Sequence, residues 1–146
     1  IHEEVEWINL VDTLEQCAAY YNRSKRKVQL SLPVESRFLG KPLAIKRCLY
    51  NVIDNAIKYG GSAEVSLYDD HDKVVIKVRD FGPGLETKWQ EKVFEPYFRV
   101  DAKTHLGSGL GLTISRSIAR SHGGDLYVQN HPQQGLIVTI QLACEL

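Results

Sequence analysis

The sequence of 146 residues contains no methionine and only three cysteines, Cys17, Cys48 and Cys144. Their odd number and irregular spacing argue against a disulfide scaffold or a metal site, so we predict three structural cysteines in a reducing compartment. No apolar run approaches the roughly 18 residues that a membrane span needs. We therefore expect a soluble, cytoplasmic chain without direct membrane contact. Because it begins at Ile1 rather than at methionine, we also expect a piece of a longer protein.

An excess of charge of either sign is also missing. Lysine plus arginine and aspartate plus glutamate number 18 each, so no overall field would attract nucleic acid or an anionic membrane. Any recognition of phosphate groups must therefore be local. With 43% apolar residues, the chain can bury its own core, and we predict one domain spanning residues 1–146.

Apolar periodicity predicts a two-layer α/β (α+β) sandwich with a mixed, largely antiparallel, five-stranded sheet covered on one face by about three helices. Gly60-Gly61 and Gly123-Gly124 are typical of helix ends. A polar stretch, 95–108, is predicted to be a mobile loop. The expected strands are 6–10, 28–32, 37–39, 63–68, 73–79, 125–130 and 136–142, and the expected helices are 11–21, 42–59, 86–94 and 109–122.

The predicted helix 42–59 carries the first candidate site. On its polar side, Asn51 and Asn55 are four residues apart and Lys58 follows one turn later. An amide oxygen is a suitable ligand for Mg²⁺, and a lysine can meet a phosphate. The alternative is an ordinary solvated helix face. The predicted apolar stripe consists of Ile45, Cys48, Leu49, Val52, Ile53 and Ala56.

The second candidate is Asp80, which continues the apolar row of the strand 73–79 and should point toward the core. A carboxylate there needs a donor. Nearby backbone amides could supply it in an Asx turn, or the exocyclic amine of a purine could, with Gly82 and Gly84 allowing the ligand close to the backbone. In the second case the site would select adenine over guanine.

Two further blocks follow. The loop of Gly107, Ser108, Gly109, Leu110, Gly111 and Leu112 leads into a helix, whose free amides suit nucleotide phosphates, although the glycines could instead serve close packing. Before it, the aromatic block 94–98 could anchor a loop, and Arg99 could neutralise a terminal phosphate. The alternative there is a hydrophobic anchor followed by an exposed arginine.

The order of these four blocks resembles the N, G1, F and G2 boxes of histidine kinases over about residues 6–145. The run from Asn51 to Gly60 matches that family's pattern with almost no departure. The resemblance implies the Bergerat-type fold shared with gyrase, Hsp90 and MutL, with ATP under a flexible lid.

The resemblance also implies a role for each matched residue, with ATP and Mg²⁺ as cofactors. Asn55 would hold Mg²⁺, and Asp80 would bind the adenine amine in a pocket lined by Tyr59. Asn51, Lys58 and Arg99 would act in catalysis, the first two at the phosphates or the metal shell and the last in transfer. The remaining contacts would come from Gly82 and Gly84 at the base, and from Gly107, Ser108, Gly109, Leu110, Gly111 and Leu112 at the phosphates.

Asn51 distinguishes between relatives that share this fold. The ATP-hydrolysing members carry a water-activating glutamate at this position, and an asparagine cannot act as a base. Transfer to an imidazole needs mainly alignment, metal and charge stabilisation, so we predict a protein-histidine kinase. Two alternatives remain, a serine kinase of the anti-sigma type and a non-catalytic nucleotide-binding regulatory module.

The acceptor histidine is not evident. None of the five histidines, at positions 2, 71, 105, 122 and 131, has the helical His-Glu-x-x-x-Pro setting typical of the family's phosphoacceptor. We therefore expect the chain to be monomeric and unable to phosphorylate itself. Its expected partners are the dimerisation domain of the same, homodimeric parent protein and a downstream response regulator.

Overall fold

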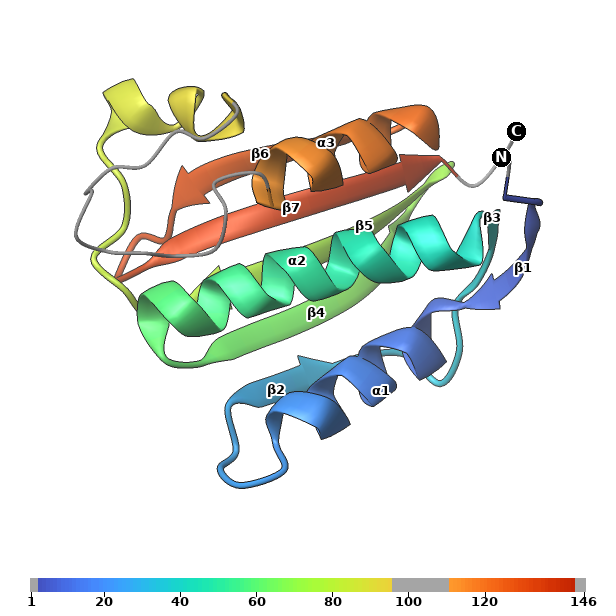
Figure 1. Cartoon of the computed structure of the whole chain (residues 1–146), viewed down its shortest axis with the longest axis horizontal. Coiled ribbons are helices and arrows are strands. Elements are labelled where there is room, and N and C mark those ends of the chain that lie inside the picture. The colour runs from blue at the N-terminus through green and yellow to red at the C-terminus, as the bar shows by residue number, and fades with distance from the viewer. Residues whose placement is uncertain (1–2, 96–110, 144–146) are drawn as a thin grey trace.

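The computed structural model of the chain describes residues 3–95 and 111–143. Figure 1 shows a sheet with helices on one side. The strands are β1 (Glu6–Asn9), β2 (Val28–Ser31), β3 (Arg37–Gly40), β4 (Ala63–Asp70), β5 (Lys73–Asp80), β6 (Asp125–Asn130) and β7 (Leu136–Ala143). The α-helices are α1 (Leu10–Tyr21), α2 (Pro42–Gly60) and α3 (Gly111–Ser121), and two short 3₁₀ helices are η1 (Thr87–Trp89) and η2 (Lys92–Phe94).

The main sheet has five strands in the order β2-β4-β5-β7-β6. The β2–β4 pair is parallel and the other three pairs are antiparallel. All three α-helices cover the same face of this sheet, which confirms the predicted two-layer sandwich (Figure 1). Strands β1 and β3 form a separate antiparallel pair that the sequence did not predict as such.

Helix α2 runs through the middle of the helical layer and has the predicted apolar stripe, whose six residues are all buried. Pro42 occupies the first turn, where a missing amide costs nothing. The carboxylate of Glu3 accepts from the backbone amides of Leu43 and Ala44, so it caps this N-terminus. Gly61 ends the helix in the left-handed conformation, and its amide donates to the Ile57 carbonyl at 2.7 Å.

The predicted strands and the predicted helices 11–21 and 42–59 all occur, with ends that shift by at most two residues. Leu10 begins α1 rather than ending a strand, because the Asn9 side chain accepts from the Val11 amide and caps the helix. The single helix expected over 86–94 is wrong, since this stretch forms η1 and η2. A short segment does not sustain an α-helix by itself, and packing selects two single turns. The helix predicted over 109–122 is described from 111, where α3 begins, and ends at Ser121.

The core lies between the helices and the sheet. Cys17 and Cys48 are buried free thiols in it, which confirms their structural role, and Cys144 lies outside the described residues. Burial raises the pKa of each thiol to about 12, so both are protonated and unreactive near neutral pH. No helix within 3–95 or 111–143 is long and apolar enough to cross a membrane.

Candidate nucleotide site

Asp80 is buried at the end of β5, with 5% of its surface exposed, as the strand periodicity predicted. Its Oδ1 atom accepts from the backbone amides of Gly82 at 2.9 Å and Leu136 at 3.0 Å. No donor in the described parts of the chain reaches Oδ2, and this atom is not sealed inside the core. The Asx turn and the ligand contact are therefore compatible, because each uses a different carboxylate oxygen.

Burial raises the pKa of Asp80, and the two amides and the charge of Arg79 offset only part of that effect. The carboxylate is therefore held in an environment that would favour a further hydrogen-bond donor. Such a donor would stabilise the charged form. A perturbed buried carboxylate with a free oxygen is typical of a binding site.

The C-terminal end of α2 packs directly on the segment that follows Asp80. A Cβ atom added to Gly82 would lie 2.8 Å from the Tyr59 carbonyl oxygen, so only glycine fits this contact. Burial and the nearby charge of Asp80 raise the pKa of Tyr59. The structure thus brings Tyr59, Asp80 and Gly82 together. Protein packing explains Gly82 without any ligand.

The turn between β6 and β7 closes the other side of Asp80. Gly135 has a φ of +92°, and a Cβ there would lie 1.9 Å from the Asp80 carbonyl oxygen. The Asn130 side chain accepts from the Leu85 amide and donates to the Leu85 carbonyl, both at 2.8 Å. These contacts fix the loop that contains Gly84, whose φ is +76°.

Asn51 and Asn55 are half-buried on α2. A Cβ on Gly111 would lie 4.0 Å from the Asn51 Cβ, so the first residue of α3 is next to Asn51. Gly60 follows Asn51 by nine positions on this helix, which is roughly 14 Å along the axis. Helix α2 therefore connects the Asp80 end of the site to the start of α3.

Lys58 has a partner that the sequence analysis did not predict. Its Nζ atom lies 2.8 Å from Asp54 Oδ2, and the two side chains are 42% and 36% exposed. Asp54 also accepts from the Tyr21 hydroxyl at 2.9 Å, which directs it toward α1. An exposed i,i+4 pair contributes only about 0.3–0.5 kcal/mol, so Lys58 can leave it for a stronger anion at little cost.

A sequence profile, "Histidine kinase-, DNA gyrase B-, and HSP90-like ATPase", matches residues 40–146. The chain belongs to this family.

Individual members of the family are similar to the chain over most of its length. The sensor histidine kinase GtrS of Pseudomonas aeruginosa is 43% identical over 142 residues, which are 97% of this chain and 30% of that protein. The adaptive-response sensory kinase SasA of Trichormus variabilis is 30% identical over 86% of this chain and 33% of its own length. The chain thus spans about a third of these relatives.

A solved structure supports the same assignment. The nucleotide-free catalytic domain of the histidine kinase ThkA superposes with a TM-score of 0.85 at 25% identity, covering 97% of this chain and 96% of that domain. ThkA has also been solved in complex with the response regulator protein TrrA.

Several residues predicted for this ATPase-family site lie outside the described ranges. They are Arg99, Gly107, Ser108, Gly109 and Leu110, together with most of the predicted loop 95–108. Leu112 is described and is 8% exposed within the core cluster. Its side chain therefore serves packing.

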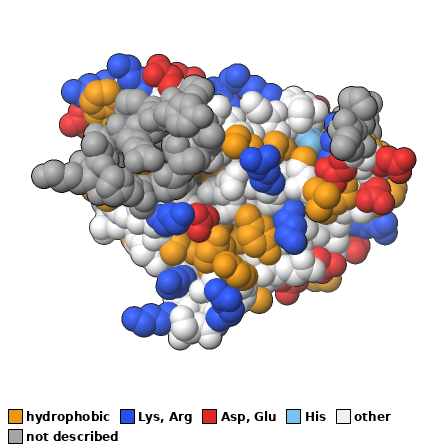
Figure 2. All heavy atoms as spheres, viewed as in Figure 1, with side chains coloured by type: hydrophobic (Ala, Val, Ile, Leu, Met, Phe, Trp, Pro, Cys, Tyr) orange, Lys and Arg blue, Asp and Glu red, His pale blue; other side chains and the backbone are white. Residues whose placement is uncertain are grey.

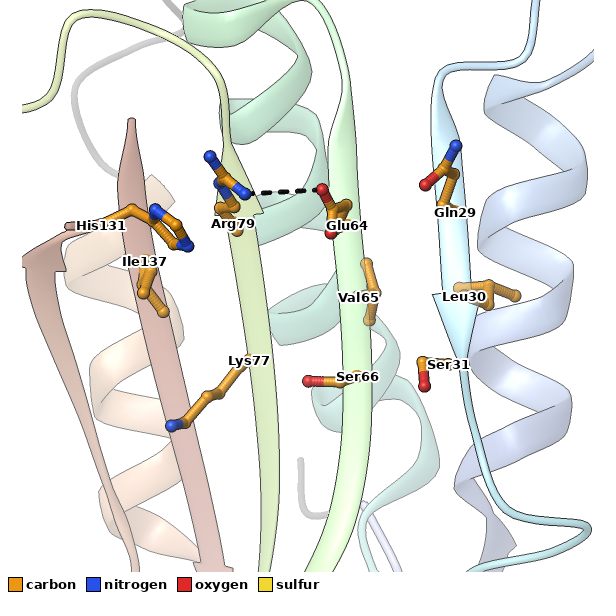
Figure 3. A pocket seen from close by; sticks show the side chains of 10 residues that line it. All are labelled: Gln29, Leu30, Ser31, Glu64, Val65, Ser66, Lys77, Arg79, His131 and Ile137. Carbon is orange, nitrogen blue, oxygen red and sulfur yellow. Dashed lines mark ion pairs between the residues drawn. The ribbon is translucent and has the colours of Figure 1, made fainter. Parts of the chain in front are cut away.

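The opposite face of the sheet has a hollow of about 270 Å³. Figure 3 shows its polar side chains on β2, β4 and β5 and at His131 in the turn before β7, with the helices behind the sheet. An ion pair of 3.6 Å joins Arg79 to Glu64 across it. None of the predicted site residues lines this hollow, because strand alternation directs Asp80 to the helical face.

Charges of one sign do not dominate the described part of the helical face. In Figure 2, basic and acidic side chains are scattered over its described part, and apolar ones lie between them. This agrees with the balanced composition and with phosphate recognition by local groups.

Sequence reasoning missed the residues that support this ATPase-family site from a distance. Leu136 donates to Asp80, and Asn130 holds Leu85, although both belong to strands far along the chain. The sequence indicated a turn that ends in Gly135, between Asn130 and Leu136. It did not indicate that this turn would pack on Asp80.

Proposed function

We propose that this chain binds Mg-ATP and donates the γ-phosphoryl group to a histidine on a separate dimerisation domain, in two-component signal transduction. One observation carries the proposal: Asp80 is buried and uses only Oδ1 for its two backbone amides. We propose that Oδ2 accepts from the adenine amine. Asn51 and Asn55 both lie on α2, and the start of α3 is next to Asn51, so we assign this end of the site to the phosphates.

The donor set suits Mg²⁺ shared with phosphates rather than held by protein alone. No cluster of three acidic, histidine or cysteine side chains that could hold a metal occurs within residues 3–95 and 111–143. Asn55 would supply one amide oxygen, which fits the preference of Mg²⁺ for few protein ligands and several waters. When bound, the ion would neutralise charge on the phosphate oxygens.

Asn51 favours transfer over hydrolysis, since its amide cannot remove a proton from water. Attack by an imidazole nitrogen on the γ-phosphorus needs no base from this chain, and ADP leaves as the bond to the β-phosphate breaks. Arg99 and Lys58 are proposed to offset charge during the transfer, and Gly107, Ser108, Gly109 and Gly111 to contact phosphates.

We further propose that the acceptor lies on another domain. Of the described histidines, His122 is buried at the end of α3, where its ring accepts from the Lys41 amide. His71 and His131 lie in turns between strands. The proposed partners are a homodimeric parent's dimerisation domain, in the cytoplasm, and a response regulator of the kind solved with ThkA.

Calorimetric titration with a non-hydrolysable ATP analogue, with and without Mg²⁺, tests the binding step. The native chain should bind more tightly with Mg²⁺, and Asn55→Ala should lose that gain while keeping its Mg²⁺-free affinity. A native chain that binds no analogue, or binds it equally with and without the ion, would refute the proposed site.

Labelled ATP then tests the transfer step, with a histidine-containing dimerisation domain added to the chain. A label stable to alkali but lost in acid indicates histidine. A label stable to acid would indicate a serine kinase, and binding without transfer would indicate a regulatory module.

A further inference from the structure

Helix α3 contacts the 3₁₀ helix η2, which follows the Asp80 loop in the chain. The Thr113 hydroxyl donates to the Phe94 carbonyl at 2.6 Å. The Arg116 guanidinium lies 4.1 Å from the centroid of the Phe94 ring. Both contacts come from the first two turns of α3, so they act near the end that faces Asn51.

Arg116 is itself held on two sides. Its Nη1 atom donates to Glu91 at 2.6 Å and its Nε atom to Asp125 at 3.2 Å, and only 13% of its side chain is exposed. Burial, which lowers the pKa of Arg116, is outweighed by these two carboxylates. The pKa of Asp125 is lowered, because amide and guanidinium donors outweigh its burial. The pair of Arg116 and Asp125 is therefore fully charged near neutral pH.

The contacts of Thr113 and Arg116 with η2 and Glu91 form a clamp between α3 and the segment before it. This segment is also connected to the loop that follows Asp80. The Gln90 side chain donates to the Leu85 carbonyl at 3.1 Å, and Asn130 holds Leu85 beside the loop that follows Asp80. A chain of contacts therefore runs from the Asp80 loop through the segment of η1 and η2 to α3. It connects the two ends of the site independently of α2.

We propose that Arg116 and Thr113 are positioning residues that set the spacing between the Asp80 loop and the start of α3, and so preorganise the chain for a nucleotide. This rests on the proposed function. Neither residue touches the ligand. A site that is already spaced for its ligand loses less conformational freedom on binding, so its affinity is higher.

Arg120 offers a matched control. Its Nε atom also donates to Asp125, at 3.0 Å, but its side chain is 55% exposed. Within residues 3–95 and 111–143, its ion pair is with Asp125 and not with Glu91. If losing an ion pair to Asp125 were enough to weaken nucleotide binding, both arginine variants would bind more weakly. If the contacts with Glu91 and Phe94 matter, only the Arg116 variant would.

The test is calorimetric titration of the whole chain with the non-hydrolysable ATP analogue and Mg²⁺, well below each variant's unfolding transition. Arg116→Ala should raise Kd about tenfold, the effect of losing charge-assisted contacts, and Arg120→Ala should leave it within about twofold. In phosphotransfer assays, Arg116→Ala should raise KM for ATP and leave kcat unchanged.

Thr113 gives a second, milder test that does not depend on whether Arg116→Ala folds. Thr113→Val removes the hydroxyl at constant shape and should raise Kd, whereas Thr113→Ser keeps the donor and should retain the native affinity. Native affinity in both Arg116→Ala and Thr113→Val would overturn the proposed positioning role and leave the proposed function standing. A native chain that binds no analogue would overturn the proposed function as well.

Discussion

The substitution Asp80→Asn separates the two roles assigned to this side chain. An asparagine Oδ1 can still accept from the amides of Gly82 and Leu136, so the turn and the β7 contact should persist. Its Nδ2 atom would replace Oδ2 and present a donor to the adenine amine, which is also a donor. The fold should survive the change and the recognition of adenine should not.

The magnitude follows from the bond that is lost. A hydrogen bond to a charged group contributes about 1.5–3 kcal/mol, which corresponds to roughly a 10- to 150-fold rise in Kd for an ATP analogue. A guanine carbonyl would accept from the new amide, so the ratio of ATP to GTP affinity should fall further than the ATP affinity alone. Calorimetric titration with both analogues measures this ratio.

Although Asp80→Asn should weaken ATP binding, it should make the folded chain more stable relative to the native chain as the pH rises toward neutral. Because burial raises the pKa of Asp80 in the folded state, its contribution to stability is full below the unfolded pKa of about 4 and is lost as pH rises through the folded value. Asparagine does not titrate. The stability of Asp80→Asn relative to the native chain should therefore increase from pH 4 to pH 7, as measured by urea denaturation.

Asp69→Asn is the matched control, since Asp69 is exposed at the far end of the β4–β5 hairpin. It should leave the nucleotide ratio unchanged. If Asp80→Asn binds the ATP analogue as tightly as the native chain while remaining folded, the assignment of Oδ2 to adenine is wrong.

Three other substitutions give sharp expectations. Gly135→Ala should destabilise the chain by at least about 2 kcal/mol in urea denaturation, because its φ is +92° and its Cβ would meet the Asp80 carbonyl oxygen; native stability would contradict that geometry. Ser115→Ala should cost about 1 kcal/mol of stability, since its fully buried hydroxyl donates to an α2 carbonyl at 3.1 Å, and no loss on thermal unfolding would count against this α2–α3 contact. Lys58→Ala should change stability by no more than about 0.5 kcal/mol yet slow phosphotransfer, and an unchanged transfer rate would remove Lys58 from the mechanism.

Local patterns in the sequence were sufficient where a single element decides the outcome. The 3.6-residue period identified the buried stripe of α2, and the two-residue period directed Asp80 inward, because these periods are properties of one helix and one strand. They failed where packing competes with local preference. The stretch 86–94 has a helical composition but forms two 3₁₀ turns.

The amino-acid sequence by itself determined the layers, the inward carboxylate and the family, since each depends on periodicity or on motif order. Only the tertiary structure decided what each site residue contacts. Leu136 reaches Asp80 from 56 residues along the chain, and Arg116 meets Glu91 from 25 residues away. Such pairs form because the sheet order and helix packing bring distant segments together, and no local pattern encodes that order.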